Sequence, residues 1–75
     1  MIKIHVGNNA NTKPLILDEK TTPTEAMRQA GVNTNATTLS LDGEVLSPRE
    51  MSKTLKELGA SEGSFLVAVT KTTDN

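Results

Sequence analysis

Hydrophobic and polar residues alternate at the start of the chain. Ile2, Ile4 and Val6 fall on one side of an extended segment, and Lys3 and His5 fall on the other. Alternation with a period of two residues is typical of a strand with one buried face. The pattern therefore predicts a β-strand over residues 2–6.

A second strand is expected over residues 15–17, after a run at residues 7–11 that is rich in asparagine. Gly and Asn favour turns because both tolerate positive φ angles. Pro14 stands just before the apolar residues, and proline is confined to strand starts and sheet edges because it donates no backbone hydrogen bond. We expect these two strands to form a hairpin with Pro14 at a start or an edge.

The second half of the chain has the pattern of another hairpin and of a closing strand. Residues 38–41 alternate, and Asp42-Gly43 then leads into residues 44–46, which is a strong hairpin signal. The last strand is expected over residues 64–70. In it, Phe65, Val67 and Val69 face one way, and Leu66 and Ala68 face the other.

Residues 22–25 carry the signals of a helix start. They combine a threonine cap, a proline at the first helical position and a glutamate placed to bond back to the cap. We expect this helix to bury Ala26, Met27 and Ala30, and to end at Gly31 in a left-handed conformation.

Residues 47–50 repeat the cap pattern of the first helix. Met51, Leu55 and Leu58 then follow at helical spacing, and Gly59 is placed to end the segment. The pattern predicts a second short helix. The element order β-β-α-β-β-α-β favours an α+β fold with a mixed sheet of four to five strands and both helices on one face. Residues 1–70 are expected to form a single domain, and residues 71–75 a polar tail.

Composition removes several classes of function. The 75 residues include no cysteine and one histidine, so disulfides, thiolate metal sites and cysteine nucleophiles are excluded, and no metal or cofactor is expected. The net charge of −1 and the single aromatic residue, Phe65, argue against nucleic-acid binding. No apolar run approaches the roughly 18 residues of a membrane span. Since the start also does not resemble a signal peptide, we expect a cytoplasmic protein.

Residues 39–50 contain an apolar strand, an Asp-Gly turn, an apolar pair and then Pro-Arg-Glu. This segment resembles the middle of the small sulfur-carrier proteins of thiamin and molybdopterin synthesis, and residues 58–69 resemble their closing turn and strand. The element order is similar to that of ubiquitin-like (β-grasp) domains in general. The resemblance implies a β-grasp fold for residues 1–70.

Carriers and modifiers of this kind end in Gly-Gly, whose terminal carboxylate is activated. The present sequence contains no Gly-Gly pair, so we expect a protein that is not competent for conjugation. A degenerate sulfur carrier or modifier that acts with an activating enzyme remains the alternative.

Ubiquitin recruits partners through an apolar patch on the open face of its sheet. The resemblance implies that a partner-binding surface here comprises His5, Ile16, Ser40, Leu66 and Ala68. Ser40 stands where ubiquitin has a large aliphatic side chain. On this assignment, Leu66→Asp would abolish partner capture without harming the fold.

A catalytic interpretation would require a partner for His5, the only histidine and hence the only conventional general base in the sequence. Ser40 would be the nucleophile on the same face, but a flat sheet provides no water-excluding cleft. The sequence therefore favours a non-enzymatic protein–protein interaction module, an adaptor or accessory subunit that is a monomer or weak oligomer. It would bind a protein partner through the open face or through a sheet edge.

Overall fold

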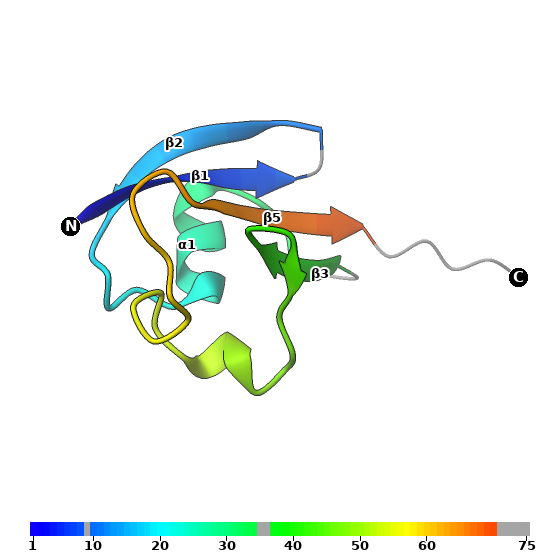
Figure 1. The fold of residues 1–75 in the computed structure, drawn as a ribbon. Coiled ribbons are helices and arrows are strands. Elements are labelled where there is room, and N and C mark those ends of the chain that lie inside the picture. The colour runs from blue at the N-terminus through cyan, green and yellow to red at the C-terminus, as the bar shows by residue number, and fades with distance from the viewer. Residues whose placement is uncertain (9, 35–36, 71–75) are drawn as a thin grey trace, which may run out of the picture.

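The computed structural model describes residues 1–8, 10–34 and 37–70 of the chain. Five strands, one α-helix and one 3-10 turn follow one another in these residues (Figure 1). In chain order they are β1 (Ile2–Asn8), β2 (Thr12–Leu17), α1 (Pro23–Ala30), β3 (Thr37–Leu41), β4 (Glu44–Val45), η1 (Glu50–Ser52) and β5 (Phe65–Thr70). The α+β fold class is as predicted, whereas the predicted tail at 71–75 lies outside the described residues.

The five strands form one mixed sheet in the order β2-β1-β5-β3-β4. The outer strands pair antiparallel with their neighbours as two hairpins, and β5 enters between them. It runs parallel to β1 and antiparallel to β3. The last strand is therefore the central one, and it joins the two halves of the chain.

The first hairpin confirms the turn prediction but has longer strands than expected. Asn8 Oδ1 accepts hydrogen bonds from the backbone N–H groups of Ala10 and Asn11, each at 2.9 Å, which is the local bonding that favours asparagine in turns. The strands continue almost to this turn, so β1 reaches Asn8 and β2 already starts at Thr12. Pro14 lies in β2, an edge strand, as predicted.

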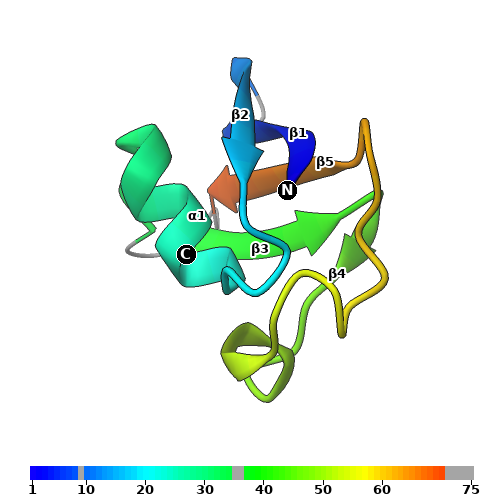
Figure 2. The ribbon, with the colours of Figure 1, turned by 90° about the vertical axis from the view of Figure 1, so that its left-hand side faces the viewer.

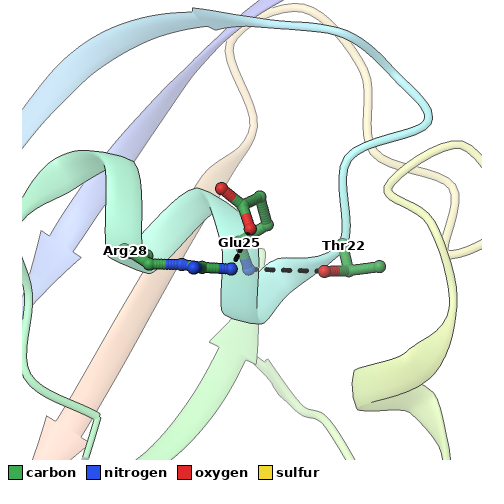
Figure 3. A network of polar contacts seen from close by, with 3 residues as sticks. All are labelled: Thr22, Glu25 and Arg28. Atoms are coloured by element: carbon green, nitrogen blue, oxygen red, sulfur yellow. Dashed lines mark hydrogen bonds and ion pairs between the residues drawn. The ribbon is translucent and has the colours of Figure 1, made fainter.

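Helix α1 begins and ends at the predicted residues. Thr22 Oγ1 accepts a hydrogen bond from the Glu25 backbone N–H at 3.3 Å (Figure 3). Gly31 follows the last turn with φ at 76°, the left-handed cap. The Glu25 side chain does not bond back to Thr22 as expected, because it pairs with Arg28 one turn further along.

Helix α1 covers one face of the sheet, and the core lies between them (Figure 2). The helix buries Ala26, Met27 and Ala30, as predicted from their spacing. Every described strand except β4 contributes to the core. Its buried hydrophobic residues are Ile4, Val6, Leu17, Ala26, Met27, Ala30, Leu39, Leu41, Leu46, Leu55, Leu66 and Ala68.

The second predicted helix is reduced to the 3-10 turn η1. Lys53 leaves the helical region with ψ at 156°, so the segment from Ser47 to Gly59 does not continue as one helix. The backbone N–H groups of Leu55 and Lys56 donate to the carbonyl oxygens of Thr21 and Glu19, at 2.8 and 2.9 Å. These two N–H groups, which would bond within a helix, thus bond to a loop that is distant in sequence. Leu55 is nevertheless buried in the core, as its spacing predicts.

The cap pattern of residues 47–50 is nevertheless present. The Ser47 N–H donates to Glu50 Oε1 at 2.8 Å, and the Glu50 N–H donates to Ser47 Oγ at 3.4 Å. Thr54 and Glu57 repeat this reciprocal pair at 3.0 and 3.2 Å. Two successive capping boxes therefore close two single turns where the sequence predicts one helix.

Candidate functional site

One face of the sheet carries α1, and the other face, here called the open face, has no helix over it in the described part of the chain. Strand pairing places its side chains in rows. Ile16 pairs with Lys3, and Pro14 pairs with His5, which pairs with Phe65. The next row runs across four strands and contains Gly7, Val67, Ser40 and Val45. In a further row, Val69 pairs with Thr38.

Apolar side chains follow the central strand along this face. Phe65, Val67 and Val69 alternate with buried residues of β5, and we call them the open-face strip. Phe65 is 48% exposed and Val69 is 40% exposed, whereas Val67 between them is half-buried. Ile16 on β2 and Val45 on β4 flank the strip and are still more exposed, at 67% and 68%. Four of the exposed large hydrophobic residues, Ile16, Val45, Phe65 and Val69, therefore lie on this face.

His5 stacks on Phe65 at one end of the strip. Their ring centroids lie 4.5 Å apart with an angle of 15° between the planes. Such offset stacks add to the free energy gained by burial alone. The stack restrains both rings at this end of the strip, because they belong to paired strands.

A polar network holds the backbone of Phe65. The Phe65 N–H donates to Asp42 Oδ1, and the Ser64 hydroxyl donates to Asp42 Oδ2, each at 2.9 Å. The Ser61 N–H donates to Ser64 Oγ at 3.0 Å. The turn between β3 and β4 is thereby connected to the start of β5, beside the His5–Phe65 stack.

Three of the five residues predicted for partner binding lie on the open face: His5, Ile16 and Ser40. Leu66 and Ala68 do not, because their exposure is 0% and 1%, and their prediction as surface residues is wrong. Register explains this orientation. Leu66 pairs with Val6 on one side and Leu41 on the other, both of which face the core, so Leu66 must face the core too.

Sequence reasoning assigned the wrong side of β5 to the surface, and so missed the open-face strip. Both sides of β5 are apolar, and a strand without polar alternation gives no signal of which side is buried. Val45 was also missed, although the Asp42-Gly43 turn that the sequence predicts pairs it with Ser40. Only pairing with β1 and β3 settles the orientation of β5.

The geometry does not support a serine–histidine pair. His5 lies on β1 and Ser40 lies on β3, with β5 between them. Two strand spacings amount to about 10 Å, which is far beyond the hydrogen-bond reach that a nucleophile and its base require.

The two edges of the sheet are β2 and β4. Strand β4 has two residues, and β2 contains Pro14, so both edges have a feature that weakens pairing with another strand. Among the described residues, no helix combines the length and the apolar character needed to cross a membrane.

Comparison with solved structures shows the fold. The ubiquitin of Caldiarchaeum subterraneum is 21% identical with a TM-score of 0.68, over 99% of this chain and 98% of that one. A ubiquitin-like domain of an Arabidopsis thaliana protein is 18% identical with a TM-score of 0.74, over 99% and 81%. A ubiquitin-like protein of Trypanosoma brucei is 23% identical with a TM-score of 0.71, over 95% of each chain.

No protein-family model matches the sequence. A search of curated proteins found none that is significantly similar. At these identities the solved structures establish architecture alone. The chain has the ubiquitin-like β-grasp fold.

Proposed function

We propose that this chain is a non-enzymatic protein–protein interaction module, an adaptor or accessory subunit, that docks a protein partner on its open face. The observation that carries the proposal is the open-face strip, in which Phe65 and Val69 are exposed and Val67 is half-buried. It lies on the central strand of a face that no helix covers among the described residues. A ubiquitin-like domain within a larger Arabidopsis thaliana protein has the same fold, which supports a module of this kind.

The residues of the open face are suited to a small protein–protein interface. Aromatic anchors are over-represented among the residues that dominate binding, and Phe65 is held by both its stack on His5 and its hydrogen bond to Asp42. Val67 and Val69 would extend the contact along β5. Ser40 and His5 would supply polar groups at its border. Leu66 and Ala68 no longer belong to the proposed surface, because they lie in the core.

The absence of catalysis is part of the proposal. It rests on the roughly 10 Å between His5 and Ser40 across two strand spacings. A cytoplasmic location is likewise proposed, and fractionation of the host cell would test it. Neither nucleic acid nor a membrane is proposed as a partner.

The alternative is a degenerate sulfur carrier or modifier that acts with an activating enzyme. Its support is the Caldiarchaeum subterraneum ubiquitin, which matches this chain over 98% of its own length. The 75 residues contain no Gly-Gly pair. Intact mass after incubation with ATP and an activating enzyme of this class separates the two functions. An adenylate or thiocarboxylate mass would support the alternative.

The test of the interaction module is a tagged capture from the host organism with cross-linking, in which variants are compared. Val67→Asp places a charge in the centre of the open face without entering the core. Gln29→Asp places the same side chain on the exposed side of α1 and is the matched control. We expect a captured protein to be lost with Val67→Asp and retained with Gln29→Asp.

Folding of both variants is checked by circular dichroism before capture. Equal capture by both variants would overturn the assignment to the open face. Loss with Gln29→Asp alone would move the surface to the α1 side. A partner that survives denaturing washes without cross-linker would indicate covalent attachment and favour the alternative.

A further inference from the structure

The turn at Asp42-Gly43 combines two features that bear on the lifetime of the chain. It is the only place in the sequence where an aspartate or asparagine precedes a glycine. Both residues have positive φ, 52° and 89°, as the two-residue turns of hairpins require. The turn therefore brings a side-chain carboxyl next to a backbone nitrogen whose residue has no Cβ to obstruct it.

We propose that Asp42 is a site of spontaneous isoaspartate formation and that its hydrogen bonds to Ser64 and Phe65 restrain the reaction in the folded chain. The Asp42 carboxylate takes up one proton from solvent, and the Gly43 nitrogen attacks its Cγ. The amide proton then leaves with the carboxyl OH as water, which closes a succinimide ring. Water then adds to one of the two imide carbonyl carbons. Addition at the main-chain carbon breaks the bond from that carbon to the Gly43 nitrogen and produces isoaspartate, with no net change in mass or oxidation state over the two steps.

The restraint follows from the contacts of the carboxylate. Oδ1 accepts from the Phe65 N–H, and Oδ2 accepts from the Ser64 hydroxyl, both at 2.9 Å. Ring closure removes one of these oxygens and turns the other into an imide oxygen. Ser64 is buried, so its hydroxyl would lose a partner that solvent cannot readily replace. The reaction thus requires local opening of the turn.

The product would disturb the open face. Isoaspartate adds one carbon to the backbone inside the turn that sets the pairing of Leu41 with Glu44. It also turns the side-chain carboxyl that accepts from the Phe65 N–H into a backbone amide carbonyl, and it leaves the free carboxylate on Cα instead. Modification at Asp42 would therefore loosen β4 and the His5–Phe65 end of the open-face strip, whatever partner binds there.

The test compares isoaspartate accumulation in four samples of the full chain at neutral pH and physiological temperature. They are the wild type, the wild type unfolded in urea, Ser64→Ala and Ala26→Gly. Ser64→Ala deletes one restraining donor. Ala26→Gly weakens α1 without touching the turn and controls for lower stability. Electron-transfer fragmentation of the tryptic peptide 29–49 distinguishes isoaspartate from aspartate at equal mass.

We expect fast conversion at Asp42 in urea and slow conversion in the folded wild type. Ser64→Ala should react about tenfold faster than the folded wild type, as the loss of a hydrogen bond to a charged group implies, and Ala26→Gly should stay close to the wild type. Equal rates in urea and in the folded chain would overturn the restraint. The restraint would also be overturned if isoaspartate formed no faster in Ser64→Ala than in Ala26→Gly. No isoaspartate even in urea would overturn the site itself.

Discussion

Asp42 and Phe65 are joined by two hydrogen bonds that run in opposite directions. The Asp42 N–H donates to the Phe65 carbonyl oxygen at 2.8 Å, and the Phe65 N–H donates to Asp42 Oδ1 at 2.9 Å. One residue is in a turn and the other begins the central strand, 23 positions later. The pair ties the second hairpin to the strand that carries the proposed binding surface.

Replacement of Asp42 by alanine should destabilise the fold. The Ser64 hydroxyl and the Phe65 N–H both lose their acceptor, and alanine tolerates the left-handed conformation less well than aspartate. We expect a loss of about 2 kcal/mol in the free energy of unfolding, measured by urea denaturation. Asp42→Asn is the control, since it keeps a side-chain oxygen for Phe65, and it should lose less. Equal losses in the two variants would contradict this account.

Gly7→Ala should be more damaging than any other replacement of a described glycine by alanine. A Cβ at Gly7 would lie 2.1 Å from the Asn11 carbonyl oxygen and 2.7 Å from Thr12 Cα, which are backbone atoms. The hairpin would have to move, and we expect a cost of about 3 kcal/mol or more. Gly59→Ala is the control, because its Cβ would meet nothing within 4 Å. It should cost only the left-handed penalty of about 1–2 kcal/mol, and the opposite order would refute the close approach.

Truncation of neighbouring residues in β5 tests which side of the strand is buried. Leu66→Ala should lower the free energy of unfolding by about 3 kcal/mol, because a fully buried leucine leaves a cavity. Val69→Ala, on the exposed side, should cost less than about 1 kcal/mol. Urea denaturation of the two variants measures the contrast. Similar losses would mean that the orientation of β5 is wrong.

The capping boxes give the fold a pH dependence. The pKa values of Glu50 and Glu57 lie below the ordinary value of 4.5, mainly because the backbone N–H groups of Ser47 and Thr54 donate to their carboxylates. A depressed pKa in the folded state stabilises the fold above the unfolded pKa, and that stabilisation is lost as the pH falls through the folded pKa.

Glu57→Gln measures this contribution. We expect the wild type to be the more stable at neutral pH, and the gap between the two urea midpoints to shrink as the pH falls below 4.5, the ordinary value for the group. Glu44→Gln, at an exposed position of β4, is the control and should show a smaller change. If the difference between the two urea midpoints did not depend on pH, the charge of the Glu57 carboxylate would not contribute to the stability of the Thr54–Glu57 cap.

Signals confined to a few neighbouring residues were read correctly from the sequence. The threonine cap at Thr22, the left-handed Gly31 and the Asp42-Gly43 hairpin each depend on contacts within about one turn of chain. The alternation of Ile2, Ile4 and Val6 also identified the buried side of β1, since the opposite side is polar. At these positions the local preference of the segment agrees with the whole fold.

Other features were settled by contacts between distant segments. The orientation of β5 depends on pairing with β1, some 60 positions earlier, because both of its sides are apolar. The helix predicted after Ser47 gave way to single turns, because the loop at Glu19 and Thr21 accepts the hydrogen bonds of Leu55 and Lys56. Two of the five residues predicted for the candidate site, Leu66 and Ala68, proved to be buried for the same reason. Local patterns select elements, but when two orientations are equally apolar, only the register of the assembled sheet can choose between them.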